Sequence, residues 1–240
     1  MRLRKIIRCF EAGSVCVTGQ RGTGKDMLMA NVIAYRKAPY VSIMDYECAS
    51  SEYHLLDFAA LSMGGITYRD LISGNFKKFK YPYPEGADIY ITDIGVFFPS
   101  QYCNELNKLY PSIPLFMALS RHIADCNVHL NVQNLNRAWD KFREQSDQYI
   151  TCNRCFVFFK GKIVLQRITI YDRADSCQAR VRPCRVRRGR GKEARANVDI
   201  YRDNFFNTHG EIRSHWLLYR NKSNYDTRFF KSLLVEESIS

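Results

Sequence analysis

Apolar and polar positions along the first 150 residues form two alternating kinds of segment. Short apolar runs are typical of buried strands, and longer stretches in which apolar residues recur every three to four positions predict helices. The predicted strands are 14–18, 40–44, 88–92 and 127–132. The predicted helices are 25–37, 51–63, 101–110, 114–124 and 136–147. This alternation predicts an α/β fold with a mostly parallel central sheet flanked by helices.

The pattern changes after about residue 150. Two apolar runs, 155–159 and 163–171, flank a Lys-Gly-Lys turn and predict a β-hairpin. The run 180–195 is rich in arginine and glycine and is typical of a loop, and 196–240 is aromatic and basic. We therefore expect a core in residues 1–150 and a small β-rich basic C-terminal region in residues 151–240.

Composition and charge narrow the classes of partner. The 240 residues are 46% hydrophobic, which is enough for a packed core, and the formal net charge is +12. The run 180–195 holds seven arginines and one lysine against one glutamate, so it supplies more than half of that charge. A chain of this kind favours polyanions, which are nucleic acids, nucleotide phosphates or anionic membrane surfaces.

Membrane insertion and disulfide bonding are not indicated. No apolar run reaches the roughly 18–20 residues that a membrane helix needs. The N-terminal apolar stretch is interrupted by Arg8 and Glu11, so we do not interpret it as a signal peptide. Nine cysteines, an odd number without a repeating frame, suit a reducing cytoplasm better than a disulfide scaffold.

A phosphate-binding loop is the strongest motif. Residues 19–25 match G-x-x-x-x-G-K between a predicted strand and a predicted helix, which is the context that the motif requires. Loop glycines let backbone N–H groups surround an anion, and the helix N-terminus adds its dipole. Lys25 would reach the β- and γ-phosphates. The predicted ATP-binding residues are Gly19, Gln20, Arg21, Gly22, Thr23, Gly24, Lys25, Asp26 and Met27, and the predicted fold class is a P-loop NTPase.

Two acidic residues are candidates for holding Mg²⁺. Asp26 stands where the motif has Ser or Thr, and its carboxylate can serve as an oxygen ligand. Asp93 ends an apolar strand, the position of the second metal-binding acid in such NTPases. Ile94 follows it, so a water-activating carboxylate must come from elsewhere, with Glu105 and Asp125 as candidates. ATP binding is expected, and hydrolysis stays open at this stage.

The C-terminal region offers two further candidate sites. Cys152, Cys155, Cys177 and Cys184 could bind Zn²⁺, although the wide spacing of the second pair favours free buried thiols. The basic run suits phosphate contacts with DNA, the alternatives being a solvated loop or a contact with anionic lipid. The candidate DNA-binding residues are Arg182, Arg185, Arg187, Arg188 and Arg190. Nearby aromatic residues that could stack on bases or lie in the core are Tyr201, Phe205, Phe206, Trp216 and Tyr219.

A further cluster carries a family resemblance. Residues 119–122 read Leu-Ser-Arg-His, Asp125 follows, and the next predicted strand leads to Gln133. Together with the phosphate loop and Asp93, this order resembles the zonula occludens toxin-like assembly ATPases of filamentous phages, which are of the FtsK–HerA type. The resemblance covers about residues 14–150. It implies an additional-strand P-loop ATPase that acts on DNA as a ring of identical subunits, such as a hexamer.

The resemblance also assigns roles and partners. Gln133 would sense the γ-phosphate, and Arg121 would act near the nucleotide or at a subunit interface. Arg137, Arg143 and Arg154 are the other candidates for an arginine finger. The implied substrate is single-stranded phage DNA, handled in the host cytoplasm or at the inner membrane face with a membrane or capsid partner. Family members usually have a membrane span, which this sequence lacks.

Three functions remain open from the sequence. The first is an ATP-hydrolysing DNA motor for packaging, extrusion or virion assembly. The second is a nucleoside or nucleotide kinase, because Gly22 between the outer glycines also suits that group. The third is a non-catalytic nucleotide-gated assembly scaffold, which Asp26 and Ile94 keep open.

Overall fold

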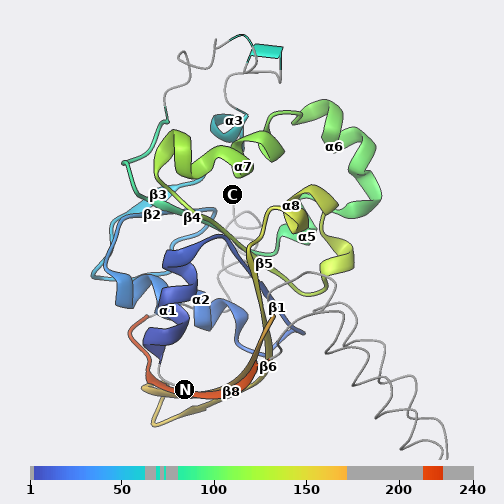
Figure 1. The fold of residues 1–240 in the computed structure, drawn as a ribbon. Coiled ribbons are helices and arrows are strands. Elements are labelled where there is room, and N and C mark those ends of the chain that lie inside the picture. The colour runs from blue at the N-terminus through green and yellow to red at the C-terminus, as the bar shows by residue number, and fades with distance from the viewer. Residues whose placement is uncertain (1–2, 63–68, 71–72, 74–80, 172–212, 224–240) are drawn as a thin grey trace, which may run out of the picture.

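The central element of the computed structural model is an eight-stranded sheet (Figure 1). The structure describes residues 3–62, 69–70, 73, 81–171 and 213–223. The strand order is β3-β2-β4-β5-β1-β6-β7-β8. The strands are β1 (Val15–Thr18), β2 (Tyr40–Ser42), β3 (Tyr53–Leu55), β4 (Asp88–Ile91), β5 (Val128–Val132), β6 (Gln148–Phe158), β7 (Ile163–Tyr171) and β8 (Arg213–Arg220).

The first six strands are parallel, β7 runs in the opposite direction, and β8 runs again in the direction of the first six. β1 pairs in parallel with β5 and with β6, and β4 pairs in parallel with β2 and β5. β7 then runs antiparallel to β6, and β8 runs antiparallel to β7. β5 lies between β1 and β4, so an additional strand separates the strand before the phosphate loop from the strand that leads to Asp93. The predicted fold class, an α/β fold with a mostly parallel central sheet flanked by helices, is confirmed.

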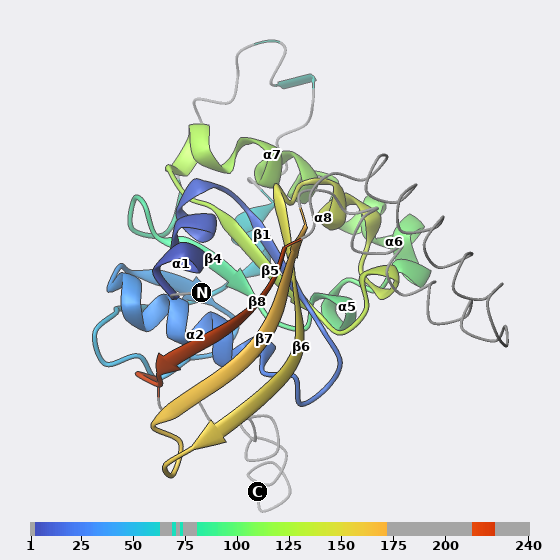
Figure 2. The same ribbon diagram turned by 60° about the horizontal axis from the view of Figure 1, so that its bottom comes forward.

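Helices lie on both faces of the parallel part of this sheet (Figures 1 and 2). One face carries α1 (Leu3–Ala12) and α2 (Lys25–Arg36), and the other carries α3 (Phe58–Leu61), α5 (Ile94–Phe97), α6 (Cys103–Leu109), α7 (Ile113–Ala124) and α8 (Asp140–Glu144). Side chains of each strand alternate between two cores: Val15 and Val17 pack with α1 and α2, whereas Cys16 packs with the opposite helices. This alternation is the period of two that a strand buried on both faces requires.

Two predicted elements are wrong in type or extent. Residues 51–63 were predicted as one helix, but they form edge strand β3 followed by α3. β3 pairs in parallel with β2, and the Asp57 carboxylate then caps α3 by accepting a 2.8 Å hydrogen bond from the N–H of Ala59. Residues 136–147 form a short 3₁₀ turn, η4 (Leu135–Arg137), and α8 instead of one helix.

The two ends of the core also differ from expectation. α1 was not predicted, although Leu3, Ile6 and Phe10 give it a buried stripe. β6 begins at Gln148, well before the predicted hairpin strand at 155, because its first residues pair with β1. The expected boundary between residues 150 and 151 therefore falls inside β6, and β6, β7 and β8 continue the same sheet. Within the part of the chain that the structure describes, no helix is long and apolar enough to cross a membrane.

Candidate functional site

The phosphate loop leaves β1 and enters α2. Gly22 and Gly24 have φ angles of 79° and 80°, in the left-handed region that favours glycine. The loop is closed by Thr23, whose backbone N–H and side-chain hydroxyl both donate to the carbonyl oxygen of Gln20, at 3.2 and 2.7 Å. Lys25 is the first residue of α2 and is buried, so the loop, the lysine and the helix N-terminus are arranged as the motif predicts.

This loop lies directly against β6. A β-carbon at Gly19 would lie 2.5 Å from the carbonyl oxygen of Cys152, and one at Gly24 would lie 2.7 Å from the Sγ atom of Cys155. Both distances are shorter than any real contact of a β-carbon, so the close packing of the loop on β6 requires glycine at these two positions. The loop therefore packs directly on β6, the strand that leads into the C-terminal region.

A glutamine on β7 holds the same loop. Gln166 is fully buried, and its amide nitrogen donates hydrogen bonds to the carbonyl oxygens of Thr23 and Gly24, at 3.0 and 2.9 Å. Its own oxygen accepts a 3.0 Å hydrogen bond from the hydroxyl of Tyr219 on β8. Gln166 belongs to none of the motifs recognised in the sequence, and the signal that could have found it is a polar residue at an inward position of an apolar strand.

The acidic side of the site is a buried hydrogen-bonded network. The Thr92 hydroxyl donates to the Asp26 carboxylate at 2.8 Å, and the Asn131 amide nitrogen donates to the same carboxylate oxygen and to the Thr92 hydroxyl. The Asn131 side-chain oxygen accepts a 3.0 Å hydrogen bond from the N–H of Asp93. These contacts tie the carboxyl ends of β4 and β5 to the start of α2. Thr92 and Asn131 are further residues without a predicted role.

Asp93 lies where its charged form is disfavoured. Burial raises the pKa of its carboxyl group above the ordinary value, and the nearby negative charge of Asp26 raises it further. Lys25, Arg21 and a side-chain hydrogen bond with Gln133 oppose this shift. The charge of Asp26 thus disfavours the ionised form of Asp93, and a divalent cation bound between them would relieve the repulsion.

The donor set fits Mg²⁺. This ion uses one or two carboxylates and completes its coordination with water and substrate phosphate oxygens. Asp26 and Asp93 supply two oxygen donors beside the phosphate loop, and the described ranges contain no group of three or more His, Cys, Asp or Glu that could form an all-protein metal cage. Asp26 and Asp93 are thus the residues that would hold the ion.

The residues predicted to form the site lie at both ends of the parallel strands. Lys25, Asp26, Asp93 and Gln133 come together at the carboxyl ends of β1, β4 and β5. Arg137 ends η4 and packs beside Gly95, just after Asp93.

Arg121 lies at the opposite edge of the sheet. Its Nε donates a 2.8 Å hydrogen bond to Asn127, which precedes β5, and its Nη2 donates to the carbonyl oxygen of Ala12 at the end of α1. Arg121 thus does not face the phosphate loop. Asp125 ends α7 at this same edge.

The remaining candidates are distributed as follows. Glu105 is exposed on α6, and Ile94 is fully buried in the core. Arg154 is exposed on β6, and Arg143 belongs to α8. Burial raises the pKa of both the Cys152 and the Cys155 thiols, which disfavours the thiolate form that binds zinc. Cys177, Cys184, Arg182, Arg185, Arg187, Arg188, Arg190, Tyr201, Phe205 and Phe206 lie outside the described residues.

Comparison with known proteins gives similarities of fold. The sequence matches no protein-family model and no curated protein. Among solved structures, the N-terminal domain of zonular occludens toxin from Neisseria meningitidis aligns with a TM-score of 0.45 and 9% identity, over 91% of this chain and 97% of that chain. The genome packaging NTPase B204 from Sulfolobus turreted icosahedral virus 2, in complex with AMP, aligns with a TM-score of 0.37 and 15% identity, over 67% and 92%.

A more partial match is the Pif1 helicase from Candida albicans, with a TM-score of 0.37 and 18% identity over 64% of this chain and 39% of that chain. The structural neighbours thus include a zonular occludens toxin domain and a genome packaging NTPase. At these identities the likeness concerns the fold, and the description of the site rests on its own geometry.

Proposed function

We propose that this protein binds Mg·ATP at the phosphate loop and hydrolyses it to move DNA during packaging, extrusion or assembly of a phage or virus. The observation that carries the proposal is the convergence of Lys25, Asp26, Asp93 and Gln133 at one edge of the sheet. Lys25 and Asp26 begin α2, Asp93 follows β4 and Gln133 follows β5, so the meeting of these three segments is a property of the fold.

The residues have distinct roles in this proposal. The loop N–H groups and Lys25 bind the phosphates, because the helix N-terminus and the lysine both stabilise negative charge. Mg²⁺, when bound by Asp26 and Asp93, supplies further charge neutralisation at the phosphate oxygens. Gln133 hydrogen-bonds to Asp93, so it can respond to the occupant of the metal and γ-phosphate positions.

Water activation needs a group from outside this cluster. Ile94 is buried and apolar, and Asp125 lies at the opposite edge. We therefore place the water-activating carboxylate and an arginine finger on a neighbouring subunit of a homo-oligomeric ring. Arg121 fits that arrangement because it is exposed at an edge that a neighbour can reach. The net charge of +12 supports DNA as the substrate that such a ring would enclose.

ATP hydrolysis with and without single-stranded DNA tests the proposal. Lys25→Ala removes the phosphate contact, and Lys5→Ala, on the exposed side of α1, is the matched control. Hydrolysis that DNA stimulates, and that only Lys25→Ala abolishes, is the expected result. Phosphate transfer to a nucleoside monophosphate would show that the protein is a kinase and not a motor.

A nucleotide-gated scaffold is the second candidate. Ile94 favours it, because the residue after Asp93 cannot polarise a water molecule. Tight ATP binding without turnover, in protein whose oligomeric state changes with ATP, would support the scaffold over the motor.

A further inference from the structure

Strands β6, β7 and β8 present a face that none of the helices in the described part of the chain covers. Figure 2 shows the three strands side by side, with the turn between β6 and β7 lying away from α6 and α7. The strand register places inward side chains such as Gln166 and Tyr219 against the phosphate loop and α2. The alternate positions point the other way. This outer face contains Arg154, Phe156, Phe158, Arg167, Trp216 and Arg220.

The aromatic side chains of the outer face are exposed, and two of them are in contact. Phe156, Phe158 and Trp216 are 44%, 45% and 44% exposed. The rings of Phe156 and Trp216 stack with centroids 6.3 Å apart and planes inclined by 24°. Exposed aromatic rings held on a rigid sheet are the feature on which unstacked nucleobases bind, because every base has a π-face.

The charged side chains of β6, β7 and β8 and of the turn between β6 and β7 are all basic. Residues 148–171 and 213–223 contain no aspartate or glutamate, whereas Arg154, Arg167 and Arg220 lie on the outer face. In the described ranges, none of these three arginines forms an ion pair with a carboxylate. Positive groups interleaved with aromatic rings match the alternation of phosphates and bases along a single strand.

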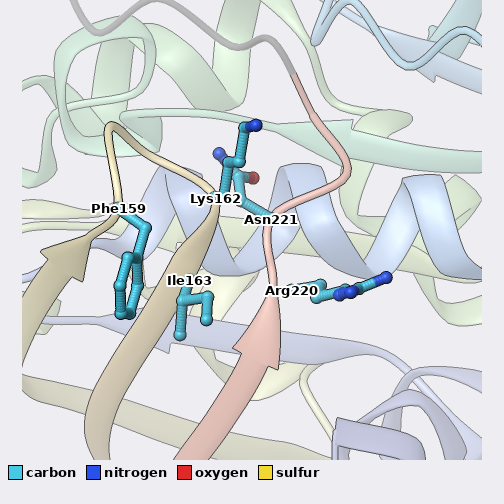
Figure 3. A pocket seen from close by; sticks show the side chains of 5 residues that line it. All are labelled: Phe159, Lys162, Ile163, Arg220 and Asn221. Atoms are coloured by element: carbon cyan, nitrogen blue, oxygen red, sulfur yellow. The ribbon is translucent and has the colours of Figure 1, made fainter.

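A pocket of about 530 Å³ extends the outer face at its hairpin end (Figure 3). Phe159, Lys162, Ile163, Arg220 and Asn221 line it. Ile163 pairs with Arg220 across the strands, and the Phe159 ring lies beside Ile163 on the same side (Figure 3). The pocket thus joins an aromatic ring with two cationic groups, which is the chemistry that a nucleotide with its phosphate requires.

We propose that the outer face of β6, β7 and β8 binds single-stranded nucleic acid, with Phe156 and Trp216 stacking on bases and Arg154, Arg167 and Arg220 contacting phosphates. The proposed site includes no residue of the arginine run at 180–195, and it requires no ATP. The occupant follows from charge complementarity, because the face is cationic and aromatic and a single strand exposes both anionic phosphates and unstacked bases.

The test is fluorescence anisotropy with a labelled oligothymidylate and no nucleotide present. Replacing Phe156 and Trp216 together by leucine keeps apolar bulk and removes the rings. Because stacking contributes roughly 1–3 kcal/mol per base, affinity should fall about tenfold or more, with the salt dependence unchanged. The matched control is Tyr102→Leu, an exposed aromatic residue before α6.

Charge is tested in parallel. The double variant Arg154→Gln with Arg167→Gln should weaken binding and reduce the salt slope by about 1.4, because each phosphate contact to a single strand contributes roughly 0.7. Lys108→Gln on α6 is the control and should change neither quantity. Lys25→Ala should keep oligonucleotide binding, so a failure of the ATPase proposal and a failure of this one are distinguishable.

Three outcomes would overturn the proposal. One is unchanged affinity in both double variants. Another is equal or tighter binding of a blunt DNA duplex, whose stacked bases cannot use the rings. The third is a wild-type oligomer that dissociates in the leucine variant in sedimentation experiments, which would make the outer face a contact between copies of this chain. Oligouridylate run beside oligothymidylate identifies RNA or DNA as the tighter single-stranded ligand.

Discussion

The side-chain amide nitrogen of Gln166 donates a 2.9 Å hydrogen bond to the carbonyl oxygen of Gly24, although the two residues are 142 positions apart in the sequence. This contact joins the phosphate loop to β7, a strand that runs against the direction of the parallel core. Arg167, the next residue along β7, lies on the outer face. The two faces of one strand thus connect the candidate nucleotide site with the proposed nucleic-acid site.

Replacing Gln166 by leucine should weaken nucleotide binding. The change leaves two loop carbonyls and the Tyr219 hydroxyl without their buried partner, which should lower the free energy of unfolding by about 1–3 kcal/mol. If the substitution destabilises the phosphate-binding conformation of the loop by about 1 kcal/mol, the dissociation constant for a fluorescent ATP analogue rises roughly fivefold.

Tyr219→Phe is the control for this prediction. It removes only the hydroxyl that donates to Gln166 and keeps the buried ring, so its effect on nucleotide affinity should be smaller. A Gln166→Leu protein that loses thermal stability but keeps wild-type ATP affinity would show that the glutamine supports the fold and not the phosphate loop.

Two glycines of the loop should tolerate alanine differently. Gly22 and Gly24 have nearly the same positive φ, so both substitutions carry the backbone cost of roughly 1–2 kcal/mol. A β-carbon at Gly22 meets nothing within 4 Å, whereas one at Gly24 meets the Cys155 Sγ at 2.7 Å. Urea denaturation should therefore show a larger loss of stability for Gly24→Ala than for Gly22→Ala.

The difference between the two variants has a specific source. Combining Gly24→Ala with Cys155→Ala removes the clashing sulfur, so part of the extra loss should be recovered. Equal destabilisation by the two single substitutions would contradict the close packing of the loop on β6.

Asp93→Asn should separate stability from the response to Mg²⁺. Without metal, the Asp93 carboxyl is disfavoured as an anion by burial and by the charge of Asp26, which is why its pKa is raised. The amide removes this repulsion, and asparagine tolerates the left-handed backbone that Asp93 adopts. The melting temperature in a chelating buffer should rise, while Mg²⁺ should no longer strengthen ATP binding.

Asp125→Asn is the matched control, because Asp125 also has a positive φ but lies at the opposite edge of the sheet. It should keep the Mg²⁺ response. If Mg²⁺ strengthens ATP binding equally in Asp93→Asn and in wild type, Asp93 is not a metal ligand.

Local features of the sequence predicted the parts of the fold that depend on neighbouring residues. The strand, loop, lysine and helix around Gly19 are contiguous, so the motif contains all of its own context. The α/β class also followed, because buried parallel strands and amphipathic helices have different periods. The edge strand β3 was missed because three residues are too few to show a period, and only pairing with β2 defines it.

Long-range contacts account for most of what the sequence did not predict. The early start of β6 depends on pairing between Val15 and Gln148, and the support of the loop depends on Gln166. Arg121 was placed by order along the chain, but α7 carries it to the edge opposite the phosphate loop. Neither pairing partners nor the edge of a sheet is encoded in local spacing.

A buried polar cluster beneath α1 predicts acid sensitivity. His129 is fully buried, accepts a hydrogen bond from the N–H of Val15 at 3.3 Å, and contacts the Asp88 carboxylate at 3.2 Å. Arg36 pairs with the same carboxylate. Burial lowers the pKa of His129. Asp88 is itself buried, which opposes ionisation, but its hydrogen bond with His129 and the Arg36 charge lower its pKa.

The sign of the effect follows from linkage. Below about pH 6.5 the unfolded chain takes up a proton at His129 that the folded chain does not, so stability falls as the pH falls, by at most about 1.4 kcal/mol per pH unit. Asp88 keeps its contribution until the pH falls below its ordinary range near 3.8. Urea denaturation at pH 7.5, 6.5 and 5.5 should therefore give decreasing stability, and His129→Gln should flatten that dependence. His122→Gln, an exposed histidine on α7, should retain the wild-type slope. A slope that persists unchanged in His129→Gln would assign the acid sensitivity to another group.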